Sequence, residues 1–154
     1  MIDNEKTVDV LNTLIQINND RIEGYDTAFK ETEEQDLKAH FSQFMQTSQK
    51  CKKELVDEVA RLGGEPTEST RVSGKFFRVW MDVKAAITGK DRKAILGSCE
   101  YGENVAYETY QDVLKDELEH LRSEQQTMIK AQHAHLKADR DLVKSMHDDL
   151  VAVA

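Results

Sequence analysis

The sequence predicts an all-α protein built as a single four-helix bundle. Apolar residues recur at steps of three and four residues over most of the chain, which is the spacing of one face of an α-helix. The 154 residues include one proline and seven glycines, so residues that break helices are rare. Long amphipathic helices bury their apolar stripes most simply by packing side by side, and a chain of this length forms one domain.

The first two predicted helices cover residues 5–31 and 34–62. The apolar spacing of the first helix has one gap, at Asn18. The second helix ends at Gly63-Gly64, because glycine readily adopts the left-handed backbone conformation that terminates helices. The short polar turn between the two helices predicts an antiparallel hairpin.

Three further helices are predicted over residues 72–88, 91–115 and 117–148. The first of these is short and lies within the long connection that follows residue 62. That connection is long enough to run the height of the bundle, because a helix rises about 1.5 Å per residue. The helices over 34–62 and 91–115 are therefore expected to be parallel. This gives the up-down-down-up order with a long crossover that ferritin-like bundles have.

The composition argues against several classes of protein. Lys and Arg number 21 against 29 Asp and Glu, which gives a formal charge of −8 at pH 7. An acidic chain is poorly suited to nucleic acids and anionic membranes. No apolar run approaches the roughly 18 residues of a transmembrane helix, and the N-terminal segment lacks the pattern of a signal peptide. We therefore expect a cytoplasmic protein with no membrane insertion and no nucleic-acid partner.

Several polar or sulfur-bearing side chains fall on the apolar stripes when each residue is placed about 100° further around its helix. They are Asn18, Ser48, Cys51, Cys99, Glu103, Gln125 and Gln132. Burying a carboxylate costs free energy unless it is paired, protonated or bound to a metal, so Glu103 is the most informative of them. Glu103 is expected either to hydrogen-bond to an inward amide or tyrosine, or to act as a metal ligand or proton-transfer group. The buried polar core is expected to include Asn18, Ser48, Gln125 and Gln132.

A single metal site is the alternative to a purely structural core. Cys51, Cys99, Glu103 and His135 offer sulfur, oxygen and nitrogen ligands, which suit a transition-metal ion such as zinc. His133 and His135 flank the stripe of the last helix, and the sequence leaves open which of them points inward. The two cysteines also suit the roles of small apolar fillers or of a redox-sensitive pair.

Several segments of the chain carry a family resemblance. They are residues 11–15, 18–25, 61–66, 77–86 and 99–103. The last of them is a C-E-x-G-E run followed by a tyrosine one or two turns later, at Tyr107 or Tyr110. Together they resemble an uncharacterised bacterial ferritin-like family known only as a four-helix-bundle domain of unknown function. The resemblance implies a ferritin-like fold without a settled activity.

Metal-bearing ferritin-like proteins hold two irons with a glutamate from each of two helices and a Glu-x-x-His pair from each of the other two. Aligned by the phase of the stripes, those positions hold Asn18, Ser48, Cys51, Cys99, Gln132 and His135. A shift of one turn replaces Cys99 by Glu103, and a second register replaces the last pair by Lys130 and His133. At best one glutamate and one histidine remain, which cannot hold a bridged di-iron centre. We expect no ferroxidase activity and no iron storage at this position.

The sequence therefore predicts a non-enzymatic ferritin-like bundle with a degenerate di-iron site and a structural, interaction or stress-related role. No cofactor is expected. The alternative is a metal-binding or thiol-redox protein that uses Cys51, Cys99, Glu103 and His135. A third hypothesis is a pocket for an apolar ligand, although core packing is the favoured interpretation of its lining. That lining is Phe41, Phe44, Tyr110 and Met128.

The first predicted helix also carries an unusually wide apolar face. The additional residues of this face are Val10, Leu14, Ile17 and Ala28. Such a face must pack either on the crossover helix or on a second subunit, which makes a homodimer a candidate assembly.

Overall fold

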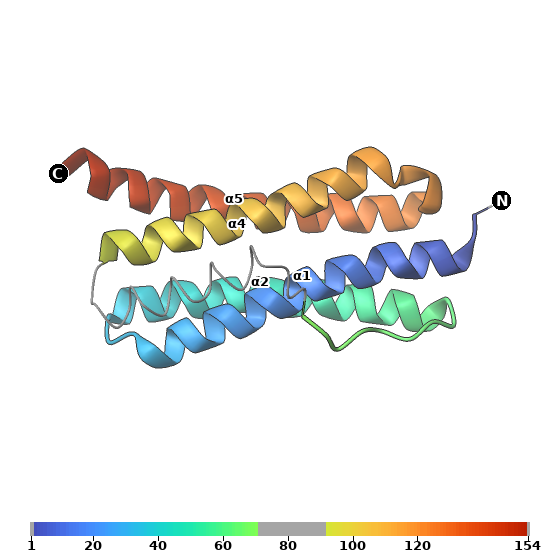
Figure 1. Cartoon of the computed structure of the whole chain (residues 1–154), viewed down its shortest axis with the longest axis horizontal. Helices are drawn as coiled ribbons and strands as arrows, with labels where there is room; N and C mark the ends of the chain where they lie inside the picture. The colour runs from blue at the N-terminus through green and yellow to red at the C-terminus, as the bar shows by residue number, and fades with distance from the viewer. Residues whose placement is uncertain (1, 71–91, 154) are drawn as a thin grey trace.

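The computed structural model describes residues 2–70 and 92–153 (Figure 1). These ranges contain four long α-helices, one short 3-10 helix and no strand. The helices are α1 (Asn4–Glu31), α2 (Gln35–Arg61), α4 (Arg92–Asp116) and α5 (Ser123–Val153), with the 3-10 helix η1 (Leu118–His120) before α5. The prediction of an all-helical protein is confirmed. The helix expected over 72–88 lies outside the described residues.

The helices pair as two antiparallel hairpins. Figure 1 shows α1 beside α2 and α4 beside α5, and α2 and α4 run in the same direction along the bundle. Each long helix makes its main contacts with two of the others, since α1 also contacts α4 and α2 also contacts α5. The two hairpins therefore face each other along the length of the molecule.

The start of α5 differs from the expected helix over 117–148. Leu118–His120 forms a 3-10 turn, and Leu121 then takes an extended backbone that lets its side chain enter the core. The regular helix begins only at Ser123. The side chain of Gln125 caps this start, because its Oε1 accepts a hydrogen bond of 2.8 Å from the backbone N–H of Arg122. Anchoring Leu121 thus interrupts the helix that the apolar spacing predicted.

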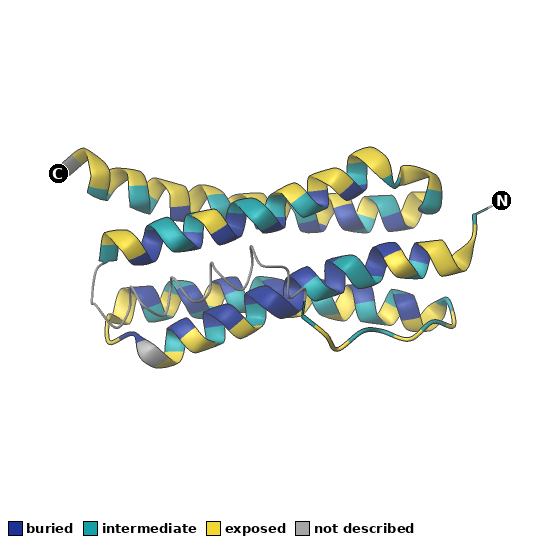
Figure 2. Cartoon of the chain, viewed as in Figure 1, coloured by how far each residue is buried: buried dark blue, intermediate teal, exposed yellow. Residues whose placement is uncertain are grey.

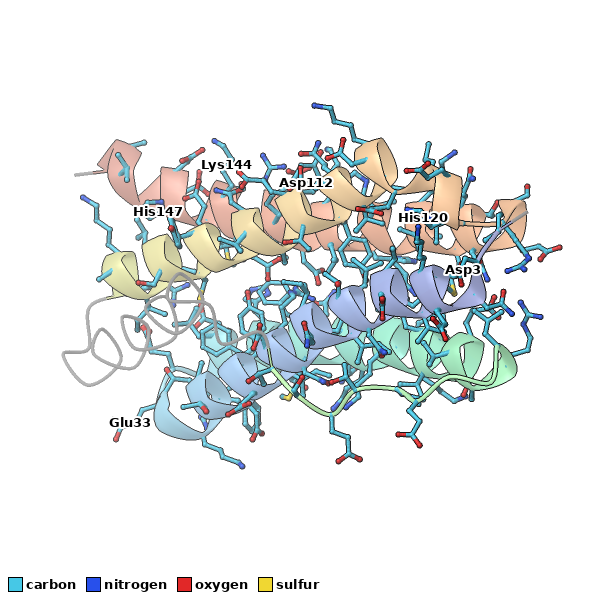
Figure 3. The ribbon with its side chains drawn as sticks, turned by 45° about the vertical axis from the view of Figure 1, so that its right-hand side comes forward. Asp3, Glu33, Asp112, His120, Lys144 and His147 are labelled. Atoms are coloured by element: carbon cyan, nitrogen blue, oxygen red, sulfur yellow. The ribbon has the colours of Figure 1, made fainter. Side chains whose placement is uncertain are left out.

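The start of α1 is fixed at the same end of the bundle. The Asp3 side chain caps the helix by accepting a hydrogen bond of 2.9 Å from the backbone N–H of Glu5. Thr7 in the first turn donates to the backbone carbonyl of His120 across the bundle. Figure 3 shows Asp3 and His120 at this end of the molecule.

The buried core consists of two apolar clusters, and Figure 2 shows the buried residues as stripes along the helices. Every long helix contributes to both clusters. On each helix a buried polar residue lies between the two contributions: Arg21, Ser48, Glu103 and Asp139. These four residues form what we call the central polar layer.

This packing also bears on two sequence predictions, one for the lining of the apolar-ligand pocket and one for the wide apolar face of α1. Phe41, Phe44 and Tyr110 belong to the apolar clusters and Met128 packs against one of them, as expected for core residues. The additional apolar face of α1 is buried within the chain, so its burial does not require a second subunit.

Within residues 2–70 and 92–153, no helix combines the length and the apolar character needed to cross a bilayer.

The end of α2 depends on two glycines with different requirements. Gly63 has φ 79°, and a Cβ added there would meet nothing within 4 Å. A Cβ added to Gly64 would lie 2.7 Å from Cγ2 of Val8 and 3.3 Å from Cγ1 of Val59. Gly64 therefore allows the start of α1 to approach the end of α2.

We expect Gly64→Ala to lower the free energy of unfolding by about 1–3 kcal/mol, because the added methyl group overpacks the contact with the stiff Val8 side chain. Gly63→Asn should cost less, since asparagine tolerates the left-handed conformation and the space is open. Urea denaturation followed by circular dichroism measures both values. A loss at Gly63 that exceeds the loss at Gly64 would contradict this account.

Candidate functional site

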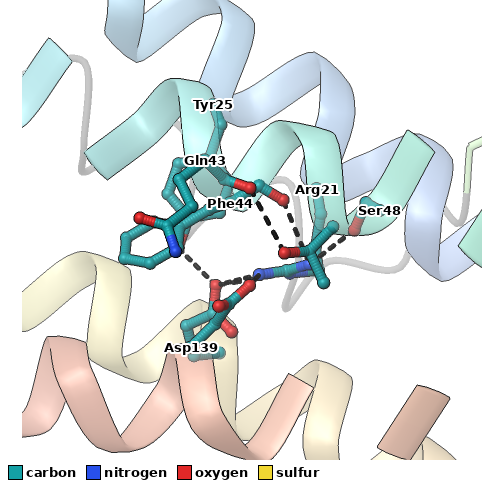
Figure 4. Close-up of polar contacts among 8 residues, drawn as sticks. Arg21, Tyr25, Gln43, Phe44, Ser48 and Asp139 are labelled. Atoms are coloured by element: carbon teal, nitrogen blue, oxygen red, sulfur yellow. Dashed lines mark hydrogen bonds and ion pairs between the residues drawn. The ribbon is translucent and has the colours of Figure 1, made fainter. Parts of the chain in front are cut away.

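The central polar layer is organised by one buried guanidinium. Arg21 lies on α1 and its side chain is 1% exposed. Its Nη2 lies 2.7 Å from Oε1 of Glu103 on α4 and 3.2 Å from Oδ2 of Asp139 on α5. Its Nη1 donates to the Ser48 hydroxyl and to the backbone carbonyl of Phe44, both on α2 (Figure 4). One arginine thus joins all four long helices.

The Glu103 carboxylate receives its hydrogen bonds unevenly. Oε1 accepts from Nε and Nη2 of Arg21, at 3.3 Å and 2.7 Å, and from the hydroxyl of Tyr25. Oε2 is buried and has no hydrogen-bond partner within the described part of the chain. The layer therefore concentrates its donors on one oxygen and leaves the other without a donor.

Burial and charge act against each other in this layer. Burial raises the pKa of the Glu103 carboxyl above its usual value, and the positive charge of Arg21 and the Tyr25 hydrogen bond offset only part of this effect. Burial disfavours the charged form of Arg21, but the neighbouring Glu103, Tyr25 and Asp139 outweigh it and raise the pKa of the guanidinium. Arg21 therefore stays positive, and one cation faces two carboxyl groups.

A second chain of buried hydrogen bonds crosses the bundle next to this layer. Asn18 donates through Nδ2 to the Tyr110 hydroxyl at 2.9 Å, and Tyr110 donates to Oε1 of Gln132 at 2.8 Å. Nε2 of Gln132 then donates to Oε1 of Glu54 at 3.1 Å and to the Cys51 carbonyl at 3.3 Å. These contacts again connect α1, α4, α5 and α2.

All four residues expected in a buried polar core are buried, namely Asn18, Ser48, Gln125 and Gln132. Gln125 lies apart from the others, at the beginning of α5. Its Nε2 donates to Oε2 of Glu58 on α2 at 3.0 Å. Gln125 therefore joins the end of α2 to the beginning of α5.

The structure does not gather Cys51, Cys99, Glu103 and His135 into one metal site. No three of these residues place ligand atoms within 4.8 Å of one another. Both cysteines are buried free thiols, and burial raises the pKa of Cys51 to about 11 and that of Cys99 still further. A high thiol pKa leaves little thiolate, which is the form that binds metals.

His135 is exposed on α5, where it lines a cavity of about 310 Å³ together with Cys51 and Glu54. His133 is half-buried and its ring stacks on Tyr107, with the ring centroids 4.6 Å apart. The sequence left open which histidine points inward, and neither of them reaches the central polar layer. The structure thus places Cys51 and His135 on one cavity, but it does not bring three of the four predicted ligands together.

Sequence reasoning missed Arg21, the residue on which the layer depends. The signal was present, because Arg21 lies three residues after Asn18 and four before Tyr25, at the helical spacing of an inward face. A lone arginine on an apolar stripe is normally assigned to the surface, since arginine is rarely fully buried unless it is paired. Its partners Glu103 and Asp139 come from distant segments, so the pairing could not be seen locally.

The fold and the site together define an all-helical bundle whose two hairpins are joined by a buried ion-pair network. The chain belongs to the family described as a domain of unknown function (DUF2383), whose profile matches residues 6–116. The matched segment includes Arg21, Ser48 and Glu103 and ends before α5, which carries Asp139. The comparison with curated proteins finds no match. Membership of an uncharacterised family agrees with the prediction.

We expect Arg21→Met to lower the free energy of unfolding by about 3–5 kcal/mol, because it leaves Glu103 and Asp139 buried without their cation. Adding Glu103→Gln to this variant should restore part of the loss. Lys53→Met removes a cation from the exposed pair with Asp57 on α2, and it should change the stability by less than about 1 kcal/mol. Urea denaturation measures all three variants. Equal effects of Arg21→Met and Lys53→Met would show that the layer does not stabilise the fold.

The raised pKa of Glu103 also predicts a pH dependence of stability. The folded protein holds this proton at pH values where the unfolded chain has already lost it. This contribution is fully present below the usual glutamate pKa of 4.5 and is lost as the pH rises through the folded-state pKa. Glu103→Gln should therefore flatten the fall in stability above pH 4.5, whereas Glu108→Gln, exposed on the same helix, should leave it unchanged. Denaturation at a series of pH values tests the difference.

Proposed function

We propose that this protein is a non-enzymatic, ferritin-like helical bundle with a structural or interaction role, whose centre holds an ion-pair network in place of a metal centre. The observation that carries this proposal is the contact of Arg21 with Glu103 and Asp139. The guanidinium supplies the positive charge that a metal ion supplies to inward carboxylates in a di-iron bundle. A metal ion would have to expel this permanent cation before it could bind the same oxygens.

The direction of the helices supports the ferritin-like part of the proposal. The two helices α2 and α4 run in the same direction (Figure 1), which is the relative direction of the second and third helices in ferritin-like bundles. The inward positions that would carry di-iron ligands in such a bundle hold Asn18, Ser48 and Gln132, which are engaged in hydrogen bonds to other side chains. These amide and hydroxyl groups suit a fixed polar core better than oxygen chemistry.

The network can determine how the two hairpins pair. Arg21 and Ser48 come from one hairpin, and Glu103 and Asp139 come from the other. A buried ion pair adds little net stability compared with apolar packing, but an unpaired buried charge is costly. The layer thus favours the single arrangement in which all of its members meet.

A metal-binding or thiol-redox protein is the second candidate. The observation that favours it is the cavity of about 310 Å³ that Cys51 shares with Glu54 and His135. Two observations weigh against it: the pKa of the Cys51 thiol is raised, and no three of the predicted ligands place ligand atoms within 4.8 Å of one another.

We expect the protein to oxidise ferrous iron no faster than buffer alone and to hold fewer than two irons per chain after desalting, because Arg21 occupies the centre of the layer, where a bridged pair would lie. Stopped-flow absorbance and elemental analysis of untagged protein provide the two measurements. Two irons per chain with the absorbance of a bridged centre would overturn the proposal. Stoichiometric metal that is lost in a Cys51→Ala, Cys99→Ala double variant would instead favour the second candidate.

A further inference from the structure

A group of possible metal ligands lies away from the central polar layer, between the first half of α4 and the last part of α5. Glu100 on α4 and His147 and Asp148 on α5 each place one ligand atom within 4.8 Å of the other two. Among the described residues, no other set of three or more histidine, cysteine or acidic side chains brings its ligand atoms this close together. Figure 3 shows His147 near the C-terminal end of α5.

We propose that Glu100, His147 and Asp148 bind one divalent transition-metal ion, for which zinc is the natural probe. One imidazole nitrogen and two carboxylate oxygens are a donor set that proteins use for zinc and for neighbouring divalent metals. Three protein ligands leave coordination positions for water, and the exposed Asp148 faces solvent. The ion would join α4, which the family profile covers, to α5, which lies beyond it.

His147 is held in place by α4 and is not a freely moving surface histidine. A Cβ added at Gly97 would lie 3.3 Å from Nε2 of His147, so the ring rests against the backbone of α4 at a position where any other residue would crowd it. Glycine is unfavourable inside a helix, and here it makes room for the ring. On the other side of the ring, Nδ1 lies 2.7 Å from Oε2 of Glu100.

This arrangement presents Nδ1 as the nitrogen that meets the carboxylates. His147 and Glu100 are partly shielded, with side chains 23% and 21% exposed. Binding would replace the contact between Nδ1 and Glu100 by bonds from both groups to the ion. The neutral imidazole would then carry its proton on Nε2.

One cation competes for the proposed site. Nζ of Lys144 lies 2.7 Å from Oδ2 of Asp148, one turn away on α5. Both side chains are more than half exposed, at 51% and 56%, so this ion pair is weak and a metal ion can displace it. Removing Lys144 should therefore strengthen metal binding at this site. The affinity of a metal ion bound elsewhere on the surface would not change.

Calorimetric titration of zinc into untagged protein tests the proposal. We expect one ion per chain at this site. His147→Gln and Glu100→Gln should each weaken binding by more than about tenfold, because even the outer-shell partners of a metal account for roughly 10–100-fold in affinity. Wild-type affinity in His147→Gln would overturn the proposal.

Lys144→Gln provides a test in which binding increases, so that failure to fold cannot imitate the expected result. We expect affinity to rise roughly twofold to fivefold, the amount of a weak surface ion pair. Lys137→Gln is the matched control, since Lys137 forms the same kind of pair with Asp141 at 2.8 Å on the same helix. Equal effects of the two lysine variants would overturn the proposal.

Two further variants separate this site from the other candidates. Zinc binding should persist in Cys51→Ser, and its loss there would assign the ion to the cavity of Cys51 and His135 and contradict the proposal. Binding should also persist in Glu103→Gln, because Glu103 belongs to the central polar layer and not to this group. The result is thus independent of the iron experiment on the centre of the bundle.

Discussion

The contact between the buried Arg21 guanidinium and the carboxylates of Glu103 and Asp139 is the interaction on which the interior of this bundle depends. An arginine cannot discharge by losing its proton, so once buried it needs acceptors at fixed places. The protein supplies them from three other helices, with Ser48 and the Phe44 carbonyl completing the set. Every long helix is thereby held at one level of the bundle.

The layer also explains why the apolar core is divided into two clusters. Sliding α4 by one helical turn would move Glu103 about 5.4 Å along the bundle and leave Arg21 without its shortest partner. Apolar side chains alone tolerate such a shift more easily, because leucine or isoleucine finds similar neighbours one turn away. The two clusters supply the apolar burial, and the layer between them distinguishes one alignment of the helices from its neighbours.

The helices and most inward positions could be predicted from sequence, because the spacing of apolar residues directly reports the buried face of a helix. The same reasoning found Glu103, Asn18 and Gln132, which are polar exceptions on otherwise apolar stripes. It missed Arg21, since the tendency of arginine to lie at the surface outweighed its angular position. It also missed the break before Ser123, which depends on Leu121 docking into a core that only the folded bundle provides.

The central polar layer gives the inner faces of the two hairpins opposite charge. The hairpin of α1 and α2 brings the guanidinium, and the hairpin of α4 and α5 brings the two carboxyl groups. If two copies of the same hairpin associated, like charges would meet in an apolar environment and repel each other strongly. Electrostatic attraction therefore favours assembly from unlike halves.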